Sequence, residues 1–327
     1  MNNDEPLISV VILTFNHEAY VQQAIQSVLD QQTTSRFEII IGDDYSSDNT
    51  RQIINGYKKQ YPALITTYYP EKNNGLLSNY TNCIKLCKGK FLASCAGDDY
   101  WHNSEKLQKQ LKLFIHHPEI GVVHSDADFF YQPTGKRIKA YRKSNKTIIL
   151  SGFIYEKLLI DNFILALTAM VRLDLIKQFV DFEEYLNLGF FMEDYPMWLE
   201  LSYHSKIEYL DESLATYRIH KKSIRNNENP AKLLDFLNTT YNVKNHFINK
   251  YGCTDEVKLL VEERYFKKVL FFANVLHNKI LAKVAFNWLS ANSRKIRIVE
   301  YLYFWTTQSA MINNLSSVLI RKLRLLK

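Results

Sequence analysis

The sequence predicts an α/β fold, a mostly parallel sheet with helices on both faces, followed by an all-helical C-terminal region. Short β-branched apolar runs alternate with amphipathic stretches over the first 125 residues, a pattern typical of parallel strands joined by helices. Such connections are right-handed and place helices over both faces of the sheet. After about residue 225 the apolar residues follow helical spacing alone. We therefore expect two domains, residues 1–224 and residues 225–327.

The strands of the first domain are predicted from the short apolar runs, and its helices from the amphipathic stretches. Residues 7–14 form the run Leu-Ile-Ser-Val-Val-Ile-Leu-Thr, which is typical of a strand buried on both faces. In residues 18–32 apolar side chains recur at helical spacing and predict an amphipathic helix. The same patterns predict strands at 37–42, 64–69, 90–95 and 121–124, and helices at 49–60, 76–87 and 103–116.

The rest of the first domain has a mixed pattern. Residues 126–143 predict an extended segment with a turn at 132–135, where proline and glycine occur. Further along the chain we expect one helix, at 195–203, and three strands, at 164–171, 206–210 and 214–218.

Composition excludes several classes of protein. Hydrophobic residues make up 46% of the 327 positions, which is enough for a full core and excludes wholesale disorder. The four cysteines form no CxxC pair, which argues against a disulfide scaffold and a cysteine-based zinc site. The N-terminus is acidic, and no uncharged apolar run reaches about 18 residues. We therefore expect a cytoplasmic protein without a signal peptide or a spanning helix.

Charge is distributed unevenly along the chain. Residues 225–327 hold 17 Lys/Arg and 7 Asp/Glu, a net charge of +10, whereas residues 1–224 have a net charge of −3. The basic and apolar residues 321–327 favour contact with an anionic surface, on the inner face of the cell membrane. The alternative is an ordinary solvated helical face. Nucleic-acid binding is disfavoured, because the positive charge is confined to this region and no recognition motif occurs.

Polar clusters follow three of the predicted strands, at the sheet edge where ligands bind in open parallel sheets. They are Thr14-Phe15-Asn16-His17-Glu18, Asp43-Asp44 and Gly97-Asp98-Asp99. The first strand-to-helix turn lacks a GxGxxG motif, and no GxxxxGK[ST] motif occurs in the chain. These absences disfavour dinucleotide cofactors and P-loop hydrolysis of nucleotides.

The adjacent carboxylates Asp98 and Asp99 suit a divalent cation that also contacts the oxygens of a diphosphate. The alternative is a surface turn that caps the helix predicted at 103–116. A second candidate ligand is His220, whose neutral imidazole can bind a metal. Its alternative is a basic loop, residues 217–222, that leaves an edge strand.

Two further carboxylate positions have both a functional and a structural interpretation. Asp43 and Asp44 stand where a carboxylate can accept an N–H from a base such as uracil, or where a strand-to-helix turn needs a cap. Asp194 precedes a helix with Pro196 in its first turn, which is typical of an N-cap. The functional interpretation of Asp194 is a general base at the edge of a cleft.

These clusters, in this order and at this spacing, resemble the motifs of the family 2 glycosyltransferases with a GT-A fold. The matching segments are 9–20, 38–50, 89–101, 193–194 and 217–220, within a resemblance that covers about residues 6–224. It implies transfer of one sugar from a nucleotide-sugar donor, usually a UDP-sugar, with inversion at the anomeric carbon. Similar enzymes often extend a glycan or a lipid-linked acceptor in the synthesis of cell-surface polysaccharides.

The resemblance also implies a nucleotide pocket. Its lining residues would be Thr14, Phe15 and Glu18. Asp44 would read the base, with Asp43 beside it. The family often has glycine or another small residue where this chain has Tyr45, so a narrower pocket is expected.

The remaining implied roles concern the reaction. Asp98 and Asp99 would bind Mn²⁺ or Mg²⁺ and the donor diphosphate, and His220 matches a position that approaches the metal or phosphates in some relatives. Asp194 would be the general base that deprotonates the acceptor hydroxyl. Many members carry an acidic residue two places before the Asp pair, where this chain has Ala96. This departure favours weaker metal binding.

Two other function classes stay open. A nucleotidyltransferase that makes the nucleotide-sugar would also use an α/β fold and an acidic metal pair. It would need a glycine-rich basic loop where this chain has residues 14–18. A non-catalytic membrane or partner module on a degenerate GT-A scaffold is the other class, and Ala96 favours it.

Overall fold

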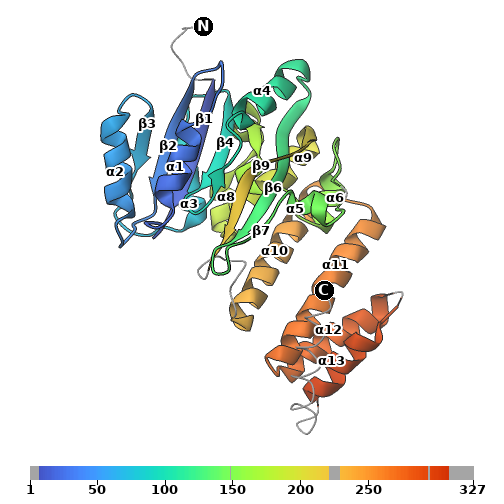
Figure 1. Ribbon diagram of the computed structural model, residues 1–327. Coiled ribbons are helices and arrows are strands. Elements are labelled where there is room, and N and C mark those ends of the chain that lie inside the picture. The colour runs from blue at the N-terminus through green and yellow to red at the C-terminus, as the bar shows by residue number, and fades with distance from the viewer. Residues whose placement is uncertain (1–6, 148, 221–228, 294, 309–327) are drawn as a thin grey trace. The chain divides into compact units, whose positions relative to one another are not determined.

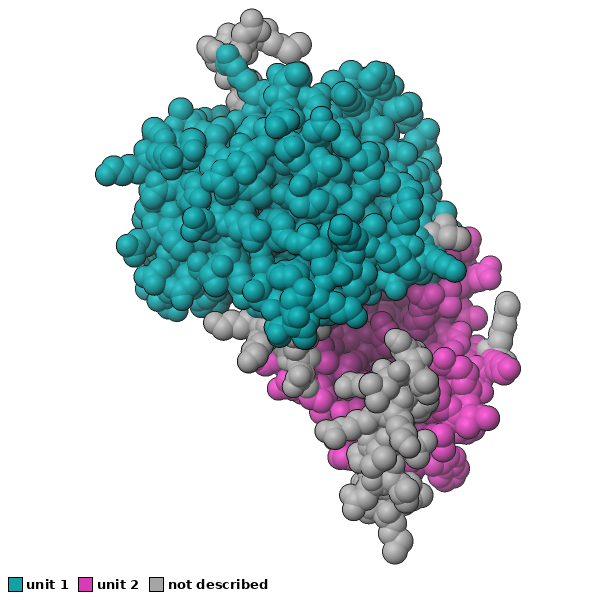
Figure 2. All heavy atoms as spheres, in the orientation of Figure 1, with its two compact units in different colours: residues 1–226 teal, residues 227–327 magenta. Residues whose placement is uncertain are grey.

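The computed structural model describes residues 7–147, 149–220, 229–293 and 295–308. The chain divides into two compact units, residues 1–226 and residues 227–327 (Figure 2). The first unit is built on one nine-stranded sheet, and the described part of the second consists of helices. The predicted α/β class and the all-helical C-terminal region are therefore confirmed.

The first half of the sheet is parallel, as predicted. Its strands are β1 (Ile8–Thr14), β2 (Phe37–Asp43), β3 (Ile65–Tyr68) and β4 (Phe91–Ala96). Their order is β3-β2-β1-β4, so β1 lies between β2 and β4 (Figure 1). Because all four strands run the same way, the loops that follow β1, β2 and β4 meet at one edge of the sheet.

Helices cover both faces of this parallel half. They are α1 (Val21–Leu29), α2 (Thr50–Gln60), α3 (Leu76–Lys85) and α4 (Lys106–His116). Val10 and Ile12 of β1 belong to one hydrophobic cluster with Ile25 of α1 and Leu111 of α4. Val11 points to the opposite face, contributes no exposed surface either, and lies on the side of the sheet that α3 covers. The β-branched run of β1 is thus buried on both faces.

The second half of the sheet is mixed rather than parallel. It contains β8 (Met170–Arg172), β6 (Ile120–Tyr131), β9 (Lys206–Ile219) and β5 (Tyr100–Trp101), with β7 (Lys136–Ile138) paired to β6. β8 is antiparallel to β4 and β6, and β5 is antiparallel to β9. The β6–β7 hairpin confirms the extended segment with a turn at 132–135. Pairing of β5 with β9 brings the loop after β4 next to the end of β9.

Short helices complete the first unit. They are α5 (Tyr141–Ser144), α6 (Tyr155–Ile160), α7 (Leu173–Phe179), α8 (Phe182–Asn187) and α9 (Asp194–His204), with a 3-10 turn at Ala166–Thr168. The strand predicted at 164–171 is wrong over most of its length. Carbonyl oxygens of this segment accept side-chain hydrogen bonds instead of a strand ladder: Trp101 Nε1 donates to Leu167 O at 2.9 Å and Gln110 Nε2 donates to Thr168 O at 2.7 Å.

The two strands predicted at 206–210 and 214–218 are one strand, β9. It pairs in parallel with β6, and its register shifts opposite Ser125, Asp126 and Ala127. This irregularity accounts for the polar residues Asp211 and Glu212, which interrupt the apolar pattern and divide the strand in the sequence.

The described part of the second unit consists of four helices, α10 (Pro230–Tyr251), α11 (Asp255–Val275), α12 (Lys279–Asn292) and α13 (Ile298–Gln308). The side chains of Asn229, Thr254 and Asn278 cap the first three. A hydrophobic cluster that includes Leu270 of α11 and Leu289 of α12 forms the core. None of the described helices combines the length and apolar character needed to cross a membrane. Residues 321–327, predicted to contact a membrane, lie outside the described part of the chain.

Candidate active site

The loops after β1 and β4 approach each other so closely that one position must be glycine. Gly97 N donates to Leu13 O at 2.7 Å, which fixes the start of the third polar cluster beside the end of β1. A Cβ atom on Gly97 would lie 2.8 Å from Thr14 Cβ and 2.9 Å from His17 Nδ1. Glycine therefore allows Asp98 to follow directly beside the loop 14–18.

The loop after β1 is fastened to the loop after β2 by reciprocal hydrogen bonds. Asn16, with a left-handed φ of 56°, donates its N–H to Ser46 Oγ at 2.8 Å. Glu18 Oε2 accepts from Asn49 N at 3.0 Å, and Asp48 Oδ2 accepts from Glu18 N at 3.1 Å. The predicted pocket residue Glu18 thus contacts Asn49, which directly precedes α2 (Thr50–Gln60), and holds the two loops together.

The other two predicted pocket residues of the first cluster differ in exposure. Thr14 is buried, and its Oγ1 has no hydrogen-bond partner among the described residues. Phe15 is exposed. Across the edge Tyr45 is exposed too, and the guanidinium of Arg51 lies 5.2 Å from its ring centroid. The edge therefore offers two aromatic rings and one buried hydroxyl.

Asp43 and Asp44 both lie at this edge, but they make different contacts. Asp43 is fully buried, forms an ion pair with Arg51 Nε at 2.5 Å and accepts a hydrogen bond from Ser46 Oγ. Asp44 accepts the N–H groups of Asn74 and Gly75, each at 2.9 Å. Asp43 therefore stabilises the β2–α2 turn, and Asp44 holds the segment before α3.

Asp98 stands at the centre of a group of three polar side chains. Its Oδ2 lies 2.9 Å from His220 Nε2 and 3.9 Å from His17 Nε2. One ligand atom from each of His17, Asp98 and His220 lies within 4.8 Å of the other two, a separation compatible with one metal ion. Burial alone would raise the pKa of Asp98, but the hydrogen bond with His220 and the nearby imidazoles hold it below its ordinary value. Burial lowers the pKa of His17, which favours the neutral imidazole that binds metals.

Asp99 lies outside this group. Its Oδ1 accepts the backbone N–H of Arg218 at 2.7 Å, and burial together with the charge of Asp98 raises its pKa. The Arg218 side chain donates to Asp98 O at 2.7 Å and to Gln132 and Gln23. Arg218 thus ties the Asp98-Asp99 loop to the end of β9, two residues before His220.

Asp194 is the first residue of α9, half-buried, and separate from the His17–Asp98–His220 group. Its Oδ1 accepts the N–H of Tyr195 at 2.6 Å. Burial raises its pKa to about 6. Burial and the adjacent Asp194 raise the pKa of Glu193 to about 8. Tyr80 connects this helix to β4, since its hydroxyl lies 3.9 Å from Met197 Sδ and 3.4 Å from Ser94 Oγ.

Two residues of the site were not predicted to act there. His17 was noted only as part of the first polar cluster, and Arg218 only as part of a basic loop. Both are recognised from contacts between segments 81 to 195 residues apart, which no local pattern records. The common signal is position: His17 directly precedes the predicted residue Glu18, and Arg218 lies two residues before the predicted residue His220.

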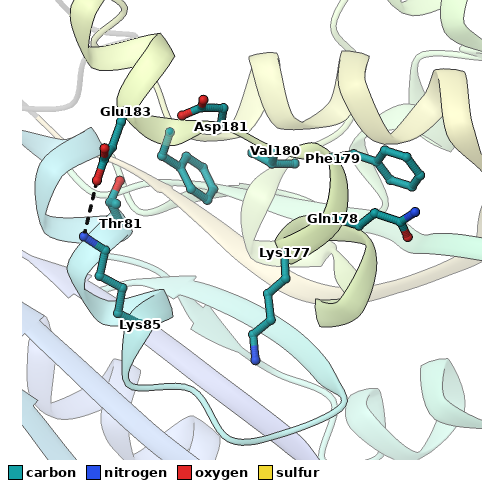
Figure 3. Close-up of a pocket in the computed structure, with 9 residues that line it drawn as sticks. Thr81, Lys85, Lys177, Gln178, Phe179, Val180, Asp181 and Glu183 are labelled. Carbon is teal, nitrogen blue, oxygen red and sulfur yellow. Dashed lines mark ion pairs between the residues drawn. The ribbon is translucent and has the colours of Figure 1, made fainter.

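A hollow between α3 and the α7–α8 segment holds none of the predicted site residues (Figure 3). Lys85 of α3 forms an ion pair with Glu183 of α8 across it at 3.9 Å, and Lys177 lies on its other side. Its lining mixes charged and apolar side chains and is open to solvent, and we assign it no part in the site.

Comparisons with known proteins identify the family of the first unit. A family model described as glycosyl transferase family 2 matches residues 9–171, from β1 into β8. The chain belongs to this family. An uncharacterized protein of Mycobacterium tuberculosis is 35% identical over 129 residues, which are 39% of this chain and 37% of that protein. The glucosyltransferase WfgD of Escherichia coli is 26% identical over 234 residues, 69% of this chain and 82% of WfgD.

Solved structures agree with the GT-A fold. This family 2 glycosyltransferase is similar to TarS of S. aureus in complex with UDP-GlcNAc, with a TM-score of 0.58 and 16% identity, over 92% of this chain and 79% of TarS 1–349. It is also similar to the mannosyltransferase PcManGT of Pyrobaculum calidifontis in complex with GDP-Man and Mn²⁺, with a TM-score of 0.58 and 13% identity, over 95% and 81% of the two chains. The chain spans well under half the length of the first curated relatives that it matches.

Proposed function

We propose that this protein transfers one sugar from a UDP-sugar to a hydroxyl group of a glycan or lipid-linked acceptor, with inversion and with a divalent metal ion. Its place would be the synthesis of a cell-surface polysaccharide. The observation that carries the proposal is the His17–Asp98–His220 group beside the two loops that follow β1 and β2. The printed name of WfgD, a UDP-Glc:alpha-D-GlcNAc-diphosphoundecaprenol beta-1,3-glucosyltransferase, supports the donor and the lipid-linked acceptor.

The residues fit a metal ion and favour Mn²⁺ over Mg²⁺. Two imidazoles and one carboxylate form a mixed nitrogen and oxygen set, whereas Mg²⁺ prefers oxygen ligands. His17 would replace the acidic ligand that many members carry two places before the Asp pair, where this chain has Ala96. When bound, such an ion neutralises charge that develops on the departing diphosphate. The Mn²⁺ complex of PcManGT supports this choice.

The nucleotide is assigned to the loops after β1 and β2. The buried Thr14 Oγ1 is available to the donor, because it has no partner among the described side chains and backbone groups. Asp44 uses both carboxylate oxygens for backbone N–H groups, yet a carboxylate has about four acceptor positions and can accept one more from a base. The exposed rings of Phe15 and Tyr45 would stack on the base or ribose.

The general base is assigned to Asp194. A carboxylate with a pKa of about 6 is mostly ionised at neutral pH, and it is a stronger base than an ordinary aspartate. It would accept the proton of the acceptor hydroxyl as that oxygen attacks the anomeric carbon from the face opposite the diphosphate. Transfer with inversion follows from this single displacement.

Thermal unfolding with a panel of ligands tests the proposal. The panel contains UDP, UDP-Glc, UDP-GlcNAc and GDP-Man, each with and without Mn²⁺. A ligand at 100 times its dissociation constant stabilises the native state by about 2.7 kcal/mol. We expect such a gain for UDP compounds with Mn²⁺, and little gain for the same compounds in chelator. No stabilisation by any nucleotide, with or without metal, would contradict the proposal.

A further inference from the structure

Helix α13 buries several polar residues and exposes several large apolar ones, which is unusual for a helix of a globular protein. Toward the other helices of its unit it presents the nearly buried polar residues Glu300, Thr306 and Thr307 together with the rings of Tyr303 and Phe304. Toward solvent it presents Ile298, Tyr301, Leu302 and Trp305, with 79%, 44%, 47% and 62% of their surfaces exposed. These four residues, the α13 stripe, follow i, i+3, i+4, i+7 spacing and therefore lie on one face.

Specific hydrogen bonds hold α13 in this orientation. Asn274 Nδ2 of α11 donates to Thr306 Oγ1 at 2.6 Å and to Thr307 Oγ1 at 3.0 Å. Within the same segment, Glu300 accepts from Arg297 Nε at 2.8 Å and from its Nη2 at 2.6 Å. Turning the helix to bury the α13 stripe would separate the buried Asn274 amide from both threonines, at a cost of about 1–3 kcal/mol. The outward stripe is thus a stable feature of the unit.

Cations outnumber acidic residues on the described part of α12, α13 and the segment between them. Residues 279–293 and 295–308 contain four Lys/Arg and one acidic residue, Glu300. Glu300 is buried and paired with Arg297, so it does not offset the exposed cations. Lys279, Lys283 and Lys295 are exposed, and the neighbouring α12 adds the exposed apolar residues Ile280 and Val284.

We propose that α12 and α13 dock on an anionic lipid bilayer, with the α13 stripe among the headgroups and the lysines against the anionic lipids. An apolar face flanked by cations without exposed carboxylates has the chemistry of a helix that lies in the membrane interface. Each lysine near such a surface contributes about 1 kcal/mol, and Trp and Tyr prefer the interface between water and acyl chains.

A second copy of the chain fits this surface less well. A twofold interface brings the same patch of both subunits together, so the patch with Lys279, Lys283 and Lys295 would face the same basic patch of the second copy. Like charges at close range oppose such an association, whereas anionic lipids neutralise them. The charge pattern therefore favours the bilayer.

Trp305 offers an optical test with the full-length protein. The chain has four tryptophans; Trp101 and Trp198 are buried, and Trp288 stacks on Phe266 at 4.6 Å, which leaves Trp305 as the exposed one. We expect vesicles of phosphatidylcholine and phosphatidylglycerol to shift its emission to shorter wavelength, and brominated acyl chains to quench it. Vesicles of phosphatidylcholine alone should have little effect, and the Trp305→Phe variant should lose the response.

Co-sedimentation with the same vesicles measures the two contributions. Ile298→Gln/Trp305→Gln should weaken binding at least tenfold, because two apolar side chains no longer leave water. Lys279→Gln/Lys283→Gln/Lys295→Gln should weaken it about 100-fold at low salt, from about fivefold per lysine. The matched controls lie in the first unit: Ile115→Gln, which changes another exposed helical isoleucine, and Lys59→Gln/Lys72→Gln/Lys88→Gln.

Three outcomes would overturn the inference: binding that does not depend on phosphatidylglycerol, equal losses in the stripe variants and their controls, or a Trp305 shift that follows protein concentration without vesicles. The last outcome would identify a second copy as the occupant. Nucleotide-dependent stabilisation, measured on the same variants, should not change. Failure of the docking surface is thereby distinguished from failure of the proposed function.

Discussion

Asp98 and Asp99 are neighbours in the sequence, but the structure predicts different consequences when each becomes asparagine. Asp98 is the one carboxylate of the His17–Asp98–His220 group. Asp99 accepts the N–H of Arg218, and asparagine keeps an oxygen for that bond. We expect Asp98→Asn to abolish metal-dependent nucleotide binding and Asp99→Asn to preserve it.

The expected magnitudes follow from the ligand set. If loss of the only carboxylate weakens binding about 100-fold, a stabilisation of about 2.7 kcal/mol at 100 times the dissociation constant falls to about 0.4 kcal/mol. For a domain of this size, 1 kcal/mol corresponds to roughly 2–4 °C in Tm. A wild-type shift of roughly 5–11 °C would become about 1 °C in Asp98→Asn. Asp99→Asn keeps a side-chain oxygen that can accept the N–H of Arg218, so it should cost at most about 1 kcal/mol without ligand.

Differential scanning fluorimetry measures both quantities, with each variant's own unliganded Tm as its reference. The nucleotide is UDP with Mn²⁺, and the matched control is the same nucleotide in chelator. Equal loss of the metal-dependent shift in both variants would refute the separation of roles. That result would mean that Asp99 also binds the metal, as the resemblance to the family implies.

Three further predictions follow from the same contacts. A general base must be ionised to accept a proton, and burial raises the pKa of Asp194 to about 6, so kcat/KM should fall about tenfold between pH 7 and pH 5. The Asp194→Asn variant should lose at least 100-fold in rate, and full activity of that variant would exclude Asp194 as the base. Gly97→Ala should lower the free energy of unfolding by about 1–3 kcal/mol, as urea denaturation measures, because its Cβ would overlap Thr14 and His17. Gly56→Ala is its control: nothing lies within 4 Å of a Cβ there, so α2 should gain up to about 1 kcal/mol. Arg218→Lys keeps the charge but cannot replace the guanidinium contacts to Asp98 O, Gln132 and Gln23, so it should destabilise the protein by about 2–3 kcal/mol in the same measurement. An unchanged denaturation midpoint would mean that the Asp98-Asp99 loop does not depend on these contacts.

The parallel half of the sheet could be predicted because its information is local. A strand buried on both faces requires a continuous apolar run, and the short, β-branched run that forms β1 favours a strand over a helix. The mixed half could not be predicted to the same degree. Residues 166–168 have the apolar character of a strand, but side chains of Trp101 and Gln110 take up their carbonyl oxygens. Such competition depends on tertiary contacts that periodicity does not contain.

Part of the candidate site could likewise be predicted from local patterns, and part of it could not. The three polar clusters were visible because the edge where parallel strands end collects ligand-binding loops. The division of labour between Asp98 and Asp99 was not visible, since both are carboxylates in one short loop. It depends on Arg218, which reaches the loop because β5 pairs with β9. His17 likewise joins the group through the fold, at 3.9 Å from an aspartate 81 positions later.

The central claim, metal-assisted inverting transfer from a UDP-sugar, is tested most directly by the product. The purified chain would be incubated with UDP-Glc or UDP-GlcNAc, Mn²⁺ and a lipid-diphosphate-linked GlcNAc acceptor, and the new linkage examined by NMR. We predict a β-linked product from these α-configured donors, formed only with metal and absent with Asp98→Asn. An α-linked product, or transfer that continues undiminished in chelator and in Asp98→Asn, would contradict the account.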